Sequence, residues 1–245
     1  MTTAGTTNFN LQLTDIVEEA FERCGKELRT GYEMRTARRS LNLLTIEWAN
    51  RGVNLWTIEY GEIPLVMNQA EYPLPVDTID LLEHVTRTGT GQNQSDLTIT
   101  RISVSTYATI PNKNATGRPI QVWINRQSGA TYPPGGEPYG TNLVTGVDHP
   151  KILVWPCPDQ SDYYTFVYWR LRRLQDAGNG TQTQDIPFRF LNSLIAGLAY
   201  YLSIKIAPER TAELKMQYEE QWKYSSEEDR DKSAVRFVPR RMFIE

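Results

Sequence analysis

The chain has 245 residues, which is enough for one large domain or two modest ones. Its 26 basic and 29 acidic residues give a net charge of -3, so the composition does not favour a protein that binds nucleic acid by neutralising phosphates. Two cysteines, Cys24 and Cys157, do not indicate a disulfide framework and fit a reducing compartment. We expect neither a signal peptide nor a membrane-spanning helix, because no stretch has the required pattern.

The first part of the chain has the pattern of two helices. The first covers residues 14–24, with Thr14 as the expected cap and Gly25 as the stop. The second is predicted from about residue 33 to 51, with Gly52 as a left-handed cap. One face of the second helix is apolar, and we interpret the basic residues of the other face as a solvated or subunit-facing surface. The apolar face carries Ala37, Leu41, Leu44 and Trp48, and the basic residues are Arg35, Arg38 and Arg39.

The middle of the chain, from residue 54 to about 173, has the pattern of seven or eight short strands. Strands at 55–60 and 63–67 are predicted to be separated by a turn at Gly61. Near the end of this region, alternation places Tyr164, Phe166 and Tyr168 on one face of a single strand. Strands of this length and spacing are typical of a small antiparallel sandwich or barrel.

Helix is predicted again after a polar linker at 175–184, with Pro187 near its start and Pro208 interrupting it. Neither helical end of the chain can bury its apolar face alone, so we expect both to pack together. The predicted fold class is therefore α+β. It consists of a discontinuous helical bundle from residues 1–53 and 186–230, an inserted antiparallel β-sandwich or barrel-like domain at 54–185, and an extended C-terminal arm at 231–245.

The arm combines apolar and basic residues without a core of its own. Such residues would be a liability if they stayed exposed on a monomer, so we expect the arm to dock on another copy or another protein. Its predicted docking residues are Val235, Arg236, Phe237, Val238, Arg240, Arg241, Met242, Phe243 and Ile244.

The sequence offers little chemistry for catalysis. Its two histidines, His84 and His149, lie outside any metal-ligand spacing, and no nucleophile elbow or phosphate-binding loop is present. We interpret the acidic pairs, Glu18 with Glu19 and the run at 227–229, as solvated or intersubunit charge. We therefore predict no catalytic, cofactor-binding or metal-ligating residues, and a protein that is not an enzyme.

Several phrases of the sequence occur together in a recognisable order. They are Leu-Asn-Leu-Leu-x-x-Glu-Trp-Ala-Asn-Arg-Gly at 41–52, Tyr-x-x-Ile-Pro-Asn-Lys at 107–113, Gly-Arg-Pro-x-x-x-Trp at 117–123, Leu-Val-Trp-Pro-Cys-Pro-Asp at 153–159, Tyr-Trp-Arg at 168–170, and Ile-Pro-Phe-Arg-Phe-Leu followed by Gly-Leu-Ala-Tyr-Tyr-Leu within 186–202. Together they resemble the head-to-tail adaptor proteins of short-tailed bacteriophages, which include the tail tubular protein A and packaged-DNA-stabilisation families.

This resemblance implies a structural protein of the phage neck or tail, assembled in the host cytoplasm. It implies a ring of about twelve copies between the portal protein and the tail nozzle or fibres, through which DNA passes without sequence-specific binding. It implies no contact with a membrane. The arm would dock on the portal, and the helical domain would supply ring and bundle contacts. For those contacts we name Arg35, Arg38, Arg39, Trp48, Tyr218 and Trp222.

One alternative stays open from the residues alone. The aromatic strands could belong to a carbohydrate-binding or cell-wall-hydrolysing virion component, which would need two carboxylates at a defined separation. Seven acids of the strand region are candidates, but no spacing singles out a pair. They are Glu59, Glu62, Glu71, Asp77, Asp80, Glu83 and Asp96.

Overall fold

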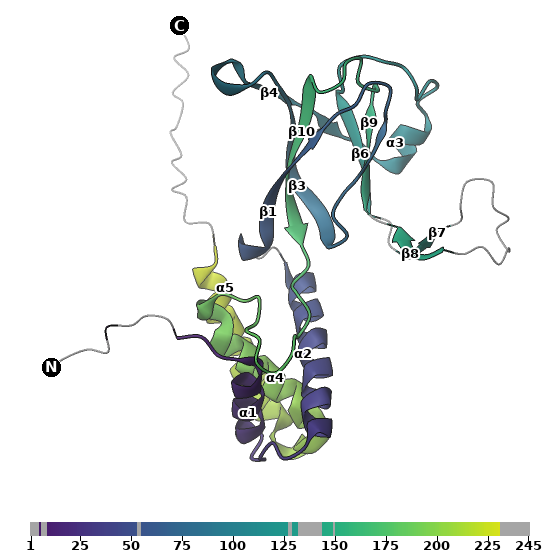
Figure 1. The fold of residues 1–245 in the computed structure, drawn as a ribbon. Coiled ribbons are helices and arrows are strands. Elements are labelled where there is room, and N and C mark those ends of the chain that lie inside the picture. The colour runs from purple at the N-terminus through teal and green to yellow at the C-terminus, as the bar shows by residue number, and fades with distance from the viewer. Residues whose placement is uncertain are drawn as a thin grey trace, which may run out of the picture. The chain divides into compact units, whose positions relative to one another are not determined.

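The computed structural model describes residues 5, 9–52, 55–126, 129–131, 144–148 and 150–230. The chain divides into two compact units, one formed by Met1–Leu55 with Gln175–Glu245 and the other by Trp56–Leu174. The first contains helices from both ends of the chain, and the second contains most of the strands (Figure 1). This mixture confirms the α+β class. The predicted arm at 231–245 and His149 lie outside the described residues.

Helix α1 (Leu13–Arg23) ends as the sequence predicts. Gly25 has a φ of 74°, and the backbone N–H of Lys26 donates to the carbonyl of Phe21 at 3.0 Å, which closes a Schellman motif. Its start differs from the prediction. Gln12 is the cap residue, and its backbone N–H donates to Asp15 Oδ2 at 3.1 Å. Thr14 lies one residue inside the helix, and its hydroxyl donates instead to the carbonyl of Gly180.

Helix α2 (Gly31–Arg51) begins in a capping box. The hydroxyl of Thr30 accepts from the backbone N–H of Glu33, whose carboxylate accepts from the N–H of Thr30 at 2.8 Å. The helix buries the predicted apolar face, namely Ala37, Leu41, Leu44 and Trp48. Gly52 follows it with a positive φ of 144°, but its ψ of −166° is extended, so the predicted left-handed cap is not formed.

Helix α4 (Leu191–Ile206) is the centre of the helical unit, because it packs against α1, α2 and α5 (Thr211–Glu228). Ten of its residues are buried, including Leu194, Leu198 and Leu202. Short 3-10 helices precede α4 at Phe188–Phe190 and separate it from α5 at Pro208–Arg210, as Pro208 predicts. A Cβ on Gly197 would approach Leu44 and Tyr218 to 2.9 Å, so glycine lets three helices meet closely.

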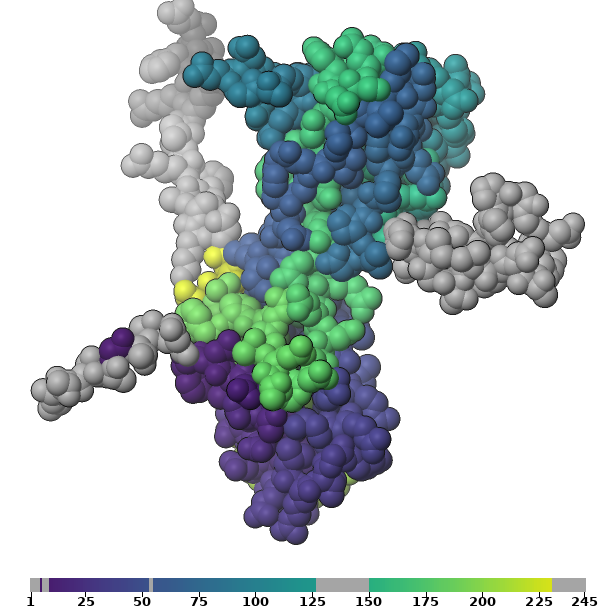
Figure 2. Space-filling view, in the orientation of Figure 1, coloured from purple at the N-terminus to yellow at the C-terminus, as the bar shows by residue number. Residues whose placement is uncertain are grey.

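The segment that follows the last strand belongs to the helical unit and not to the β unit, which moves the predicted boundary from residue 185 to residue 174. The reason is its hydrogen bonding. The backbone N–H of Leu13 donates to Gln182, and that of Ala177 donates to the side chain of Asn42 at 2.7 Å. Figure 2 shows this segment, in green, on the surface next to the purple residues of α1.

The β unit contains two four-stranded sheets. The first has the order β1 (Ile58–Pro64), β10 (Tyr164–Arg172), β3 (Thr78–Thr88), β4 (Ser95–Thr98). The second has the order β2 (Glu71–Pro73), β9 (Lys151–Trp155), β6 (Gln121–Asn125), β5 (Thr100–Arg101). Pairing is antiparallel except between β5 and β6. A separate hairpin pairs β7 (Gly129–Thr131) with β8 (Val144–Asp148). Short helices lie at Leu55–Thr57, Gly91–Asn93 and Val104–Ala108, the last being α3.

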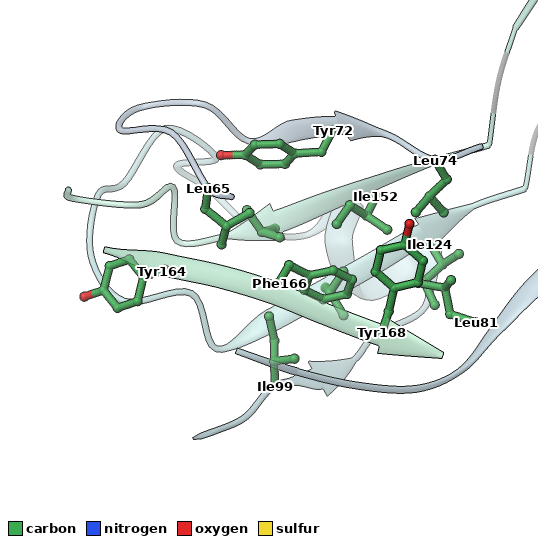
Figure 3. Packing of buried hydrophobic residues seen from close by; sticks show 12 residues of the cluster. Leu65, Tyr72, Leu74, Leu81, Ile99, Ile124, Ile152, Tyr164, Phe166 and Tyr168 are labelled. Atoms are coloured by element: carbon green, nitrogen blue, oxygen red, sulfur yellow. The ribbon is translucent and has the colours of Figure 1, made fainter. Parts of the chain in front are cut away.

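Side chains from both sheets form one buried cluster (Figure 3). Tyr164, Phe166 and Tyr168 of β10 all belong to it, as alternation predicts, together with residues such as Ile152 of β9 and Ile124 of β6. The cluster therefore joins the two sheets into a single hydrophobic core.

The predicted turn at Gly61 is wrong, because β1 runs through this residue. Gly61 lies opposite Tyr168 in the ladder, and a Cβ there would lie 2.4 Å from the Tyr168 ring. The glycine makes room for an aromatic ring of the neighbouring strand. Close approach of another group is, besides a bend or bulge, a common reason for glycine in a strand.

Candidate interaction surfaces

The basic residues of α2 form one surface, which we call the arginine face: Tyr32, Arg35, Arg38, Arg39 and Asn42. Steps of three and four residues bring these side chains to one side of the helix, where they line a hollow of about 520 Å³. Arg35 and Arg39 are exposed, and Arg38 is half-buried. The sequence prediction named the three arginines but missed Tyr32, which is 66% exposed.

The arginine face lacks compensating negative charge. Arg38 donates to the carbonyl of Ala177 at 3.3 Å, and Arg39 donates to the hydroxyl of Thr36 at 3.4 Å. Within the described part of the chain, no carboxylate forms an ion pair with Arg35, Arg38 or Arg39. Three neighbouring guanidinium groups repel one another, so this surface is suited to an anionic partner.

A second hollow of about 480 Å³ has the opposite charge, and we call it the acidic hollow. It is lined by residues of α1, by the start of α4 and by the chain before α1: Phe9, Leu11, Asp15, Glu18, Glu19, Glu22, Leu191, Asn192 and Ile195. Arg23 is the basic group at its edge, where it donates to Glu19 at 2.9 Å and to Asn192 at 3.3 Å. Glu18 and Glu22 are exposed. The interpretation of Glu18 and Glu19 as intersubunit charge remains a prediction.

The predicted contact residues Trp48 and Tyr218 are fully buried within the helical unit. The indole N–H of Trp48 donates to the hydroxyl of Tyr218 at 2.9 Å, and that hydroxyl donates to Glu47 at 3.3 Å. Trp222 is half-buried, with its ring 4.8 Å from that of Trp48. These residues hold the bundle together, and Trp48 and Tyr218 have no surface to offer a neighbour.

Arg51 closes this cluster at the end of α2. It donates to both carboxylate oxygens of Glu219, at 2.9 and 2.7 Å, and to Glu47 at 2.7 Å, while its guanidinium lies over the ring of Tyr218. The hydrogen bonds from Arg51 lower the pKa of Glu219. Burial, and then the bond to Glu47, raises the pKa of Tyr201 to about 12. Glu219 is therefore ionised and Tyr201 neutral at neutral pH.

The acidic run at 227–229 is not uniformly solvated. Asp229 is buried, forms an ion pair with Arg189, and accepts the backbone N–H of Leu55 at 2.9 Å. It fixes the end of α5 within the helical unit. The prediction of a solvated acid is therefore wrong for Asp229, whereas Glu227 is exposed.

Most acids of the strand region are engaged in ion pairs. Arg170, which is buried, pairs with Glu59 and with Asp77, and its hydrogen bond lowers the pKa of Asp77. Arg87 pairs with Glu62 and Asp96. The remaining pairs join Asp80 to Arg101 and Arg126, and Glu71 to Lys151.

Cysteines and clustered metal-binding side chains are among the residues that often carry catalytic chemistry. Cys24 and Cys157 are free thiols and are buried, and burial raises the pKa of each. Cys24 donates to the carbonyl of Ala199. No group of three or more His, Cys, Asp and Glu side chains among the described residues could hold a metal ion. In the same part of the chain, we find no helix of the length and apolarity needed to cross a membrane.

Comparison with known proteins gives the family. The sequence model of the family described as SU10 adaptor protein matches residues 12–241, nearly the whole chain. The chain belongs to this family. The match confirms the predicted phage head-to-tail adaptor family, and it implies a structural adaptor at the neck of the virion that interacts with portal and tail components. A search of curated proteins found no match to this chain.

Proposed function

We propose that the adaptor forms a closed ring at the neck of the virion, between the portal protein and the tail nozzle or fibres. The family match supports the location, and the arginine face, which forms no ion pair within the described part of the chain, supports self-assembly. The three arginines repel one another, and an anionic surface on a partner would relieve that repulsion. In a ring of about twelve copies, every arginine face could be covered by the next copy.

In this proposal the protein has a structural role and is not an enzyme. The carbohydrate-hydrolysing alternative requires two free carboxylates facing a cleft. Six of the seven candidate acids form ion pairs with arginine or lysine, and this weakens the alternative. No specific contact among the described residues favours it.

The ring would leave a channel for DNA during ejection, without sequence-specific contacts. The overall charge of -3 supports this part of the proposal, since a net basic ring would retain DNA by counterion release. Strong, salt-sensitive retention of duplex DNA by the isolated ring would contradict it.

The assembly is tested by measuring mass with and without the portal ring of the same phage. We expect a species of 28.1 kDa alone and a closed ring of adaptors on each portal. A chain that stays monomeric on the portal, or that does not bind it, would refute the ring.

The arm is tested in the same measurement. We propose that residues 235–245 dock on the portal, because their apolar side chains would be a liability if they stayed exposed. Removal of these residues should abolish attachment to the portal without changing the helical content in circular dichroism. Normal attachment of the shortened chain would contradict this role.

A further inference from the structure

The two charged surfaces of the helical unit lie on different helices. The arginine face lies on α2, and most of the acidic hollow lies on α1. In Figure 1 these two helices occupy opposite sides of the helical unit, with the segment after β10 running between them. One chain therefore carries two oppositely charged surfaces on two different helices. That arrangement suits head-to-tail contact between identical copies.

The charges of the two surfaces match in number. The arginine face presents three guanidinium groups and no carboxylate. The acidic hollow presents four carboxylates, and Arg23 at its edge neutralises one of them. Three positive charges would therefore meet three uncompensated negative charges. Guanidinium and carboxylate groups form short, often bidentate hydrogen bonds, which would fix the register of one copy on the next.

Each of the two surfaces also carries one exposed aromatic residue. Phe9 at the acidic hollow is 73% exposed, and Leu191 and Ile195, which also line it, are buried. Tyr32 at the arginine face is 66% exposed. Charges steer and orient an association more than they strengthen it, whereas aromatic side chains supply much of the contact energy. The two aromatic residues would provide that contact between copies.

We propose that the acidic hollow of one copy binds the arginine face of the next copy, and that this contact repeats around the ring. The inference rests on the proposed ring but goes beyond it, since it assigns the partner of each surface. The contact is heterologous, so each copy uses both surfaces and no surface is left unpaired when the ring closes.

Charge reversal tests the pairing directly. One variant carries Arg35→Glu and Arg39→Glu, and the other carries Glu18→Lys and Glu22→Lys; all four side chains are exposed, so both should fold. Each variant alone brings like charges together, and we expect at least a tenfold loss of ring formation on the portal. An equimolar mixture should restore the ring, because each altered surface then meets its complement on the other variant.

A control matched to the arginine variant carries Lys215→Glu and Lys223→Glu on α5. It makes the same change in net charge as that variant, at two other exposed positions. It should form rings as the unaltered chain does.

Rings of the unaltered chain should also weaken between about 50 mM and about 500 mM salt, because screening reduces the attraction between exposed charges.

The outcomes separate the two proposals. If the unaltered chain forms no ring on the portal, the ring and its interface are both wrong. If the unaltered chain and both variants form rings equally well, only the assigned interface is wrong. Binding of a labelled duplex DNA is the last measurement. If the arginine variant forms rings normally but loses strong DNA binding, the partner of the arginine face is a phosphate backbone and not a second copy.

Discussion

His84 on β3 is a half-buried histidine whose ring stacks on Phe166, with the centroids 5.8 Å apart. Its Nδ1 is buried and has no hydrogen-bond partner among the described residues. Burial, and then the charge of Arg101, lowers the pKa of His84 below its ordinary value of 6.5, although Glu83 and Asp80 oppose this shift. The neutral ring is thus the form that the folded β unit accommodates.

This environment predicts a pH dependence of stability. The unfolded chain binds a proton at His84 at higher pH than the folded chain does, so the free energy of unfolding should fall as the pH decreases from about 8 to about 5. His84→Phe keeps a flat ring against Phe166 and removes the titrating group, so its stability should depend less on pH. Urea unfolding followed by tryptophan fluorescence measures both proteins. Equal slopes against pH would show that His84 does not contribute.

At the scale of elements, the crossing of α4 with α2 and α5 depends on Gly197. A methyl group there would lie 2.9 Å from both Leu44 and Tyr218, and the hydroxyl of Tyr218 is held by Trp48. We expect Gly197→Ala to lower the free energy of unfolding of the helical unit by about 1–3 kcal/mol, because the packed helices must separate. Urea unfolding followed by circular dichroism measures this change.

Gly31→Ala is the matched control at the start of α2. Apart from its chain neighbours and the nearby backbone of α2, no atom lies within 4 Å of the added methyl group. This substitution should leave stability unchanged or raise it by up to about 1 kcal/mol, since alanine restricts the unfolded chain. If Gly197→Ala is as well tolerated as this control, close helix packing does not explain the glycine.

The elements also show how far the sequence predicts this fold. Helices α1, α2, α4 and α5 and most strands follow from periodicity, and the buried face of α2 follows from steps of three and four residues. Gly61 was misread because a glycine that makes room for the ring of Tyr168 looks like a turn glycine in sequence. The acidic hollow was missed because its walls, at residues 9–22 and 191–195, are far apart in the chain.

At the scale of the whole molecule, net charge conceals the distribution of charge. The chain carries only -3 overall, yet it presents an arginine face on one helix and an acidic hollow on another. Composition alone does not favour a nucleic-acid-binding interpretation, but it cannot reveal two complementary surfaces. Such separation within a nearly balanced chain favours contact with an identical copy over contact with a polyanion.

The division into two units predicts that the β unit folds alone. Every member of its hydrophobic cluster lies between Leu65 and Tyr168, inside the unit Trp56–Leu174. The helical unit is discontinuous, because the apolar face of α2 needs α4 from the other end of the chain. A chain of residues 56–174 should therefore unfold cooperatively on heating, whereas residues 1–55 alone should be unfolded. Circular dichroism measures both. A β fragment without a cooperative transition would show that its core depends on the helical segments.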